Sequence, residues 1–106
     1  MDILEVAKEA RRIFRLEGTW TQRVMARDSL GLSCAPTSSG AQCWCTAGAF
    51  INAANCDARL EDEALRQVSD FCLARLGMEL LDWNDAEGRT QEEVLKFMDE
   101  FISTLT

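Results

Sequence analysis

The residues best suited to bind a small molecule lie in two short segments, each built around a tryptophan. Aromatic walls with a few polar groups are typical of ligand sites, and Arg27 and Arg89 could take an anionic group. Asp28 or Asp85 could act as a general base if burial raised its pKa. One hypothesis is therefore a groove for a small polar or anionic ligand, or for a modest enzymatic reaction, formed by Trp20, Gln22, Arg27, Asp28, Trp83, Asn84, Asp85 and Arg89.

The same residues also have a structural interpretation. A tryptophan beside polar residues often closes the edge of a core, with its indole N–H donating to a loop carbonyl. Asn84 and Asp85 are residues whose side chains bond to nearby backbone in turns. Arg27 could pair with its neighbour Asp28 or anchor an anion. The sequence leaves these alternatives open.

Several kinds of catalysis are excluded by composition. The chain has no histidine, so Ser-His-Asp and Cys-His mechanisms cannot be built from it. It has no tyrosine, and its only lysines are Lys8 and Lys96, which leaves acid-base chemistry to carboxylates, cysteines or these two amines. We expect no catalytic residue and no cofactor, although the composition does not exclude an enzyme.

The cysteines are expected to be reduced thiols. An odd number without an export signal argues against a disulfide framework. Cys43 and Cys45 are two positions apart, which on a helix turns their side chains about 200° from one another and disfavours zinc. The alternative is a reactive thiol near a helix start at about Ala41. The acidic residues 82–87 lack the spacing of a calcium loop, so no metal site is expected. The five cysteines are Cys34, Cys43, Cys45, Cys56 and Cys72.

The acidic charge is concentrated in the second half of the chain. The formal net charge is −7, and residues 54–106 hold thirteen acidic and five basic side chains. Such a surface repels nucleic-acid phosphates and anionic lipid, whereas it attracts a basic protein surface. We expect Glu92, Asp99 and Glu100 to contact such a partner, with no direct nucleic-acid or membrane binding. The sequence also lacks a leader and an apolar stretch of about 18 residues, which predicts a cytoplasmic protein.

The elements that must position these residues are predicted to be helices. Apolar residues spaced three and four apart predict helices over residues 3–17 and 41–54, between Asp57 and Gly77, and from Thr90 to the C-terminal end. Capping boxes are expected at Asp2, Thr90 and Ser39, the last with Gln42. The small residues of the second helix would allow a neighbouring element to approach closely.

The connecting segments carry weaker signals. Residues 19–28 are expected to form one or two helical turns, with Thr21 as a cap, and residues 29–40 a loop with a brief extended pairing near Leu30 and Leu32. Residues 78–81 are expected to be extended and residues 82–89 a turn-rich loop. The prediction is one compact all-α domain, residues 1–106, with about four principal helices, an irregular middle loop and at most a minor extended pairing.

Three spaced motifs stand out along the chain: Trp20-x-Gln22 with Ala26-Arg27-Asp28, Trp44-Cys45-x-x-Gly48-Ala49, and Trp83-Asn84-Asp85-x-x-x-Arg89-Thr90-x-x-Glu93-Val94. Together they resemble a family of small uncharacterised proteins from bacteria and their phages. The resemblance spans roughly residues 20–101 and implies a shared fold and a mobile-element setting, but no reaction.

Three functional hypotheses follow. The first is a non-enzymatic interaction protein, of phage or mobile-element origin, that binds a basic surface of a host protein, for example as an anti-CRISPR-like inhibitor of bacterial defence. The second is the ligand-binding or enzymatic groove described above. The third is a self-associating module, such as a homodimer, held by an exposed apolar strip that includes Phe97 and Phe101.

Overall fold

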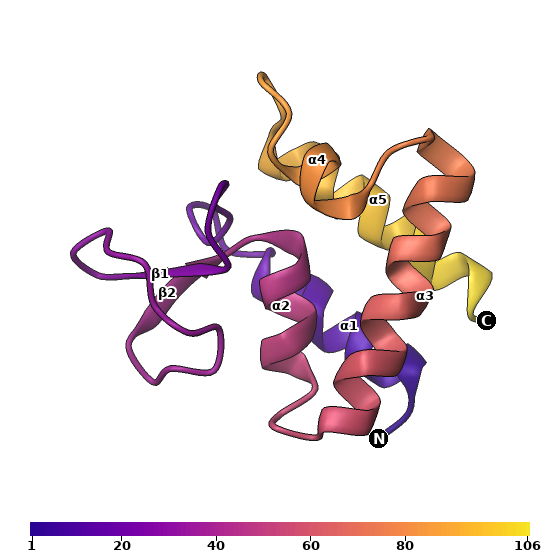
Figure 1. Cartoon of the computed structure of the whole chain (residues 1–106), viewed down its shortest axis with the longest axis horizontal. Coiled ribbons are helices and arrows are strands. Elements are labelled where there is room, and N and C mark those ends of the chain that lie inside the picture. Colours follow the sequence, from indigo (N-terminus) through magenta and orange to yellow (C-terminus); the bar gives the residue numbers. More distant parts are fainter.

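The computed structural model describes residues 1–106 and is mostly helical, with one small two-stranded antiparallel sheet (Figure 1). α1 crosses behind α2 and α3 in that view, and the sheet projects to one side of the helices. The elements are α1 (Ile3–Ile13), β1 (Ala26–Asp28), β2 (Ala41–Trp44), α2 (Thr46–Ala53), α3 (Ala58–Leu76), α4 (Leu80–Asn84) and α5 (Gln91–Thr104). The prediction of a helical domain with a minor extended pairing is confirmed.

The core lies between α1, α2, α3 and α5 and is organised around aromatic rings. Phe101 of α5 meets Phe50 of α2 edge to face, with ring centroids 5.9 Å apart, and also packs against Phe71 of α3. Phe97, one turn earlier, lies 4.6 Å from the ring of Trp83. Such pairs contribute about 1 kcal/mol each beyond the apolar area that they bury. The apolar stripes of the helices therefore meet in one core, as their periodicity predicts.

Four of the predicted helix ends are confirmed. Asp2 and Thr90 each form a capping box with the glutamate three residues later, at the starts of α1 and α5. Asp57 caps α3, where its side chain accepts from the Leu60 N–H at 3.1 Å. Gly77 ends α3 in the left-handed conformation, at φ 70°, which glycine adopts without steric cost.

The first helix is shorter than predicted, because it ends at Ile13 instead of residue 17. Polar side chains take up the carbonyls that a longer helix would use. The hydroxyl of Thr19 donates to the carbonyls of Ile13 and Leu16, at 2.8 and 2.7 Å, and the amide of Gln91 donates to those of Phe14 and Leu16. These contacts from distant residues turn the chain away from the helix axis.

The prediction of a helix over residues 41–54 is wrong in its first part. Residues Ala41–Trp44 form β2, which pairs with β1 in the register Ala26 to Trp44 and Arg27 to Cys43. The helix starts only at Thr46 and is capped by Cys45, so the expected capping box of Ser39 and Gln42 is not formed. Pairing with a strand elsewhere in the chain overrides the local helical pattern here.

Residues 19–28 form no helix: they contain a bridge between Trp20 and Trp44, bends over residues 22–25 and strand β1, so the predicted helical turns and the Thr21 cap are also wrong. The N–H of Thr21 donates to the Trp44 carbonyl at 3.0 Å, and the N–H of Trp44 donates to the Thr19 carbonyl at 2.8 Å. The chain then turns back at the segment expected to pair near Leu30 and Leu32. There the Asp28 N–H donates to the Leu32 carbonyl at 2.9 Å, which confirms that brief pairing.

The segment after α3 is also more helical than predicted. Leu80–Asn84 form α4, in a region expected to be extended and then a loop. Leu80 and Trp83, three positions apart, are both buried, and this spacing places them on one face of a helical turn. A single short turn offers too few residues for this pattern to be visible in the sequence.

Candidate functional site

The three tryptophan motifs meet at Asn84, whose side chain is fully buried. Its oxygen accepts from the indole N–H of Trp20 at 2.8 Å. It also accepts from the backbone N–H and the hydroxyl of Thr46, at 2.9 and 2.7 Å. Thr46 opens α2 directly after the Trp44-Cys45 motif. One buried amide oxygen therefore joins residues from three distant parts of the chain.

The other polar groups around Asn84 also have hydrogen-bond partners within the fold. The side-chain nitrogen of Asn84 donates to the Thr21 carbonyl at 3.2 Å and to the Asp85 carboxylate at 2.9 Å. The amide of Gln22 donates to the carbonyls of Asn84 and Ala86, at 2.9 and 3.0 Å. Every buried polar side-chain atom has a partner. These residues hold the extended segment against α4, and their polar atoms are already engaged.

Arg27 and Asp28 each bind their own surroundings and do not pair with one another. The guanidinium of Arg27 donates to the Thr21 hydroxyl at 2.9 Å, to the Gly31 carbonyl at 3.0 Å and to the Gln22 carbonyl at 3.3 Å. The carboxylate of Asp28 accepts from two backbone N–H groups in the turn that follows it. Arg27 therefore does not form the ion pair with Asp28, and its guanidinium holds the surrounding loop instead.

Trp83 and Arg89 form a separate stacked pair at the end of α4. The guanidinium carbon of Arg89 lies 4.4 Å from the centroid of the Trp83 ring, and its Nε donates to the Trp83 carbonyl at 2.9 Å. Arg89 also pairs with Glu93 at 3.3 Å. The hydrogen bond from the Thr90 N–H lowers the pKa of the Glu93 carboxyl, and the positive charge of Arg89 lowers it further by a smaller amount. No single hollow collects the eight residues of the predicted groove, since Trp83 and Arg89 line one and Asp85 another.

The contacts of the tryptophans agree with the structural interpretation, in which they close the edge of the core. The indole of Trp44 donates to the Pro36 carbonyl at 2.9 Å, and that of Trp20 donates to Asn84. Trp83 is nearly inaccessible, with 5% of its surface exposed. The tryptophans therefore brace the loops and close the core edge.

Two of the five cysteines, Cys45 and Cys72, lie in buried environments that favour the protonated thiol. The sulfur of Cys45 accepts from the Gly48 N–H at 3.2 Å at the start of α2, and burial raises the pKa of this thiol. Burial likewise raises the pKa of Cys72. The helical premise of the zinc argument is wrong, because Cys43 lies in β2. The structure nevertheless brings no three metal-binding side chains together.

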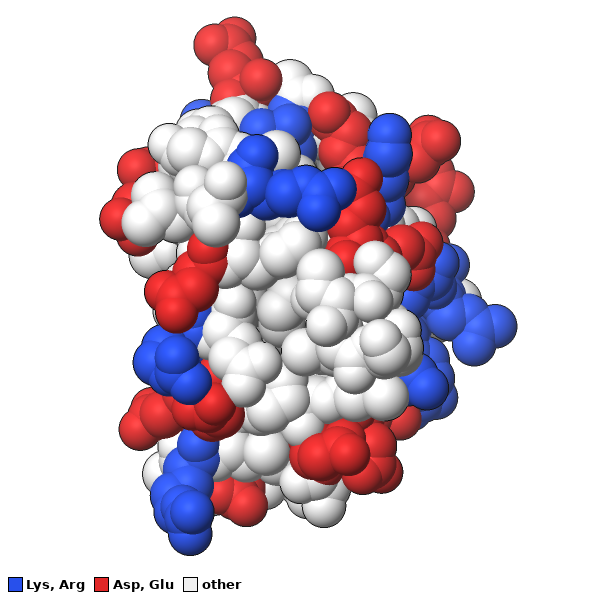
Figure 2. Space-filling model, turned by 90° about the vertical axis from the view of Figure 1, so that its right-hand side faces the viewer, with Lys and Arg blue, Asp and Glu red and all other residues white.

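The carboxylates expected to contact a partner differ in how free they are. Asp99 forms an ion pair with Arg11 of α1, and Glu100 lies 3.6 Å from the guanidinium of Arg75 on α3. Glu92 is exposed, and no ion pair includes it. Side chains of both signs border an uncharged area on the face that carries α3 and the C-terminus (Figure 2). Asp99 and Glu100 therefore serve contacts between helices as well as the surface charge.

The expected self-association strip is wrong, because its two phenylalanines are in the core. Phe97 and Phe101 are 4% and 2% exposed. Their ring contacts with Trp83, Phe71 and Phe50 use the same faces that a second copy would need. The two rings are therefore not available on the surface of the folded chain.

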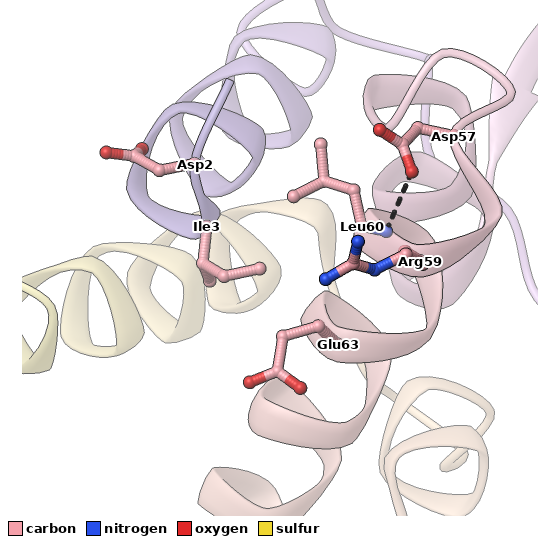
Figure 3. Close-up of a pocket in the computed structure, with 6 residues that line it drawn as sticks. All are labelled: Asp2, Ile3, Asp57, Arg59, Leu60 and Glu63. Atoms are coloured by element: carbon pink, nitrogen blue, oxygen red, sulfur yellow. Dashed lines mark hydrogen bonds between the residues drawn. The ribbon is translucent and has the colours of Figure 1, made fainter.

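A first hollow, of about 320 Å³, lies between the starts of α1 and α3 (Figure 3). Asp2 and Asp57 border it, and both are helix caps whose carboxylates accept backbone N–H groups. Ile3 and Leu60 are its only apolar walls. The hollow is thus a by-product of two capped helix starts.

A second hollow, of about 430 Å³, lies where α3, α4 and Met25 meet, and no sequence motif predicts it. Its apolar walls are Met25, Ala47, Leu65, Leu80 and Leu81, and its acidic residues are Glu79 and Asp82. A smaller hollow of about 230 Å³ shares Met25 and Leu81 and reaches Arg23 and Asp85. The signal available in the sequence was the Leu80-Leu81 pair, since a short helix can bury only one of two successive leucines.

The comparisons with known proteins give a family but no activity. A family model described as a family of unknown function, DUF6197, matches residues 1–104. No curated protein and no solved structure matches the chain. No helix has the length and apolar character needed to cross a membrane.

Proposed function

The chain belongs to a family of unknown function, DUF6197, and we propose that it is a non-enzymatic interaction protein that binds a basic surface of another protein. The observation that supports this most is a set of exposed carboxylates without basic partners at the α4 end of the molecule. We call this set the acidic α4 surface; it consists of Glu79, Asp82, Glu87 and Glu92.

The acidic α4 surface differs in its pairing from five of the nine other carboxylates of residues 54–106, whereas Asp57, Glu61, Asp62 and Asp85 also lack an ion pair. Five other carboxylates of residues 54–106 are bound by arginines: Glu63, Asp70, Glu93, Asp99 and Glu100. Over residues 79–92 the only basic side chain is Arg89, which stacks on Trp83 and pairs with Glu93. Figure 1 places α4 and its connection to α5 together at one end of the molecule. The negative potential there is free to attract a cationic partner.

The ligand-groove hypothesis has less support from the geometry. The side-chain N–H groups of its arginines, asparagine and glutamine already donate hydrogen bonds to backbone carbonyls within the fold. A ligand would have to break this network to reach them, and each buried polar group left unpaired would cost about 1 to 3 kcal/mol. A site for anion binding instead keeps its donors free and directed at the ligand.

The biological setting is proposed from the resemblance to small proteins of bacteria and their phages. There the partner would be a host protein in the cytoplasm that handles nucleic acid, and the acidic α4 surface would compete with phosphates for its basic face, as in an anti-CRISPR-like inhibitor of defence. Phage plating on a strain with active CRISPR interference tests this setting. Plating restored by the chain would support it, and unchanged plating with several interference types would contradict it.

The binding proposal is tested by capture of proteins from a bacterial lysate with paired charge variants. Asp82→Asn with Glu87→Gln removes two charges from the acidic α4 surface, whereas Glu17→Gln with Glu61→Gln removes two from elsewhere. Both pairs change the net charge equally, so an effect of overall charge would weaken capture equally. We expect the chain to capture a basic protein in stoichiometric amount and to release it as salt rises. Only the first pair of variants should lose this protein. Equal retention or equal loss in the two pairs would contradict the proposal.

A further inference from the structure

We infer that the two hollows around Met25 and Leu81 form one docking groove for a basic amphipathic helix of the partner protein. We call it the Met25–Leu81 groove. This inference rests on the proposed function, because it gives the part of the partner that the acidic α4 surface attracts. It adds that the partner contributes apolar side chains as well as positive charge.

The groove carries apolar side chains that are exposed to solvent in the folded chain. Leu81 is 51% exposed and Met25 is 36% exposed, although both stand beside fully folded elements. Leu65 of α3 and Ala47 of α2 also line the larger hollow. The hollows of about 430 and 230 Å³ share Met25 and Leu81 and could each accept one apolar side chain. Burial of a leucine side chain in such a hollow contributes favourable binding free energy.

The wall that carries Met25 is fixed before any partner binds. The carbonyl of Met25 accepts from the Cys45 N–H at 3.0 Å. Gly48 of α2 lies directly beneath it, and a Cβ at that glycine would come within 2.1 Å of the Met25 oxygen. Arg23 has a positive φ of 74°, and its N–H donates to the Asp85 carboxylate at 2.9 Å. A preformed groove lowers the entropy lost on binding.

The charge around the groove specifies a basic partner. The lining residues include Glu79, Asp82 and Asp85 and only one basic side chain, Arg23. Glu79 and Asp82 have no ion pair within the chain. An acidic or neutral apolar segment would leave these carboxylates facing an unmatched surface. Lysine or arginine residues on both sides of an apolar stripe would match them.

The geometry favours a helix over an extended peptide. A strand that adds to a sheet needs free backbone groups along an edge. Here the Met25 carbonyl and the Arg23 N–H are already bonded, and the other walls of the larger hollow are side chains from α2, α3, α4 and the N-cap of α4. A helix needs only apolar anchors, and residues three or four positions apart lie about 5 to 6 Å apart on one face. Two such anchors suit two adjoining hollows.

The test uses three labelled peptides of equal length and fluorescence anisotropy with the full chain. The first carries leucines at helical spacing among lysines. The second replaces its leucines with serines and keeps its charge, and the third replaces its lysines with glutamates and keeps its leucines. We expect binding of the first peptide, binding weaker by tenfold or more for the second, and none for the third. Amide NMR shifts of residues 25, 65, 69 and 81 should move on titration with the first peptide.

Paired leucine variants separate the groove from the remaining surface. Leu81→Ser removes a groove wall, while Leu73→Ser removes a leucine that is also 51% exposed and lies outside both hollows. We expect about tenfold weaker binding of the first peptide for Leu81→Ser and no change for Leu73→Ser. Both residues are half exposed, so both variants should fold, which circular dichroism checks.

The outcomes distinguish the two proposals. If the leucine and serine peptides bind equally and Leu81→Ser has no effect, while Asp82→Asn with Glu87→Gln weakens both, the groove is wrong and the acidic surface stands. If no lysine peptide binds, both proposals fail. If the leucine peptides bind regardless of their charge, the acidic partner surface is wrong. Formation of a dimer of the chain through residues 25 and 81 would also overturn the inference.

Discussion

The indole N–H of Trp20 donates to the side-chain oxygen of Asn84 at 2.8 Å, across 64 positions of the chain. The same oxygen accepts both the N–H and the hydroxyl of Thr46, at the start of α2. A buried acceptor with three donors is costly to remove, because each donor loses its partner without gaining water. This contact therefore links residues of three motifs and makes Asn84 central to the folded state.

Replacement of Asn84 by alanine should destabilise the protein severely. The change leaves the Trp20 indole and the Thr46 groups without their shared acceptor and opens a small cavity. We expect a loss of roughly 3 kcal/mol in the free energy of unfolding. Urea unfolding followed by circular dichroism measures it.

Trp20→Phe is the matched control for this network. It keeps an aromatic ring at the same place and removes only one of the three donors, so the expected loss is about 1 kcal/mol from the hydrogen bond. A loss for Asn84→Ala no larger than that for Trp20→Phe would show that the Thr46 contacts contribute little.

The parts of the fold that were predictable from the sequence are those set by local chemistry. Asp2 and Thr90 cap helices through residues three positions away, and Gly77 ends α3 through its own backbone. Such signals need no knowledge of the rest of the chain. The predictions of α3, of α5 and of the start of α1 succeed for this reason.

The errors occur where distant residues decide the backbone. Ala41–Trp44 is a strand because β1 supplies partners for its backbone groups, and α1 ends early because Gln91 and Thr19 bind its last carbonyls. The Met25–Leu81 groove was unpredictable for the same reason, since its walls come from four separate elements. Both the ligand-binding and the structural interpretation of the tryptophan motifs were available from the sequence, but only the fold shows that Trp20, Gln22, Asn84 and Asp85 meet in one hydrogen-bond network.

Gly48→Ala should destabilise the protein although alanine is the better helix former. The new Cβ would lie 2.1 Å from the Met25 carbonyl oxygen, so the segment that leads into β1 would have to move away from α2. We expect a loss of roughly 2 kcal/mol, which exceeds the gain of about 1 kcal/mol in helix propensity.

Gly40→Ala is the control for that substitution. A Cβ at Gly40 would have only Ser38 within ordinary contact distance, at 3.7 Å. The unfolding midpoint of this variant in urea should stay close to that of the unmodified chain. A Gly48→Ala protein as stable as Gly40→Ala would contradict the close approach of Met25 to α2.

The five thiols should differ in their reaction with a disulfide reagent at pH 8. Cys56 is exposed and should react first, whereas burial encloses Cys45 and Cys72 and raises the pKa of both. Reaction requires the thiolate, so these two should react only after denaturant is added. Peptide mass mapping of the labelled protein identifies each site. Rapid labelling of Cys45 in the folded chain would revive the hypothesis of a reactive thiol at this helix start.

The capping box of α5 should make stability depend on acid. The Glu93 carboxyl accepts from the Thr90 N–H at 3.0 Å. This bond, and to a smaller extent the positive charge of Arg89, lowers the pKa of the carboxyl below the ordinary value of 4.5. A depressed folded-state pKa contributes stability that is present above the unfolded value and is lost as the pH falls through the folded one. Glu93→Gln should therefore be less stable than the unmodified chain at neutral pH, and this difference should shrink as the pH falls below about 4.5.

Glu92→Gln removes the same charge from the neighbouring residue without touching the capping bond, so it should leave this pH dependence unchanged in urea unfolding. Identical acid profiles for Glu93→Gln and Glu92→Gln would mean that the charge of the capping box does not stabilise α5.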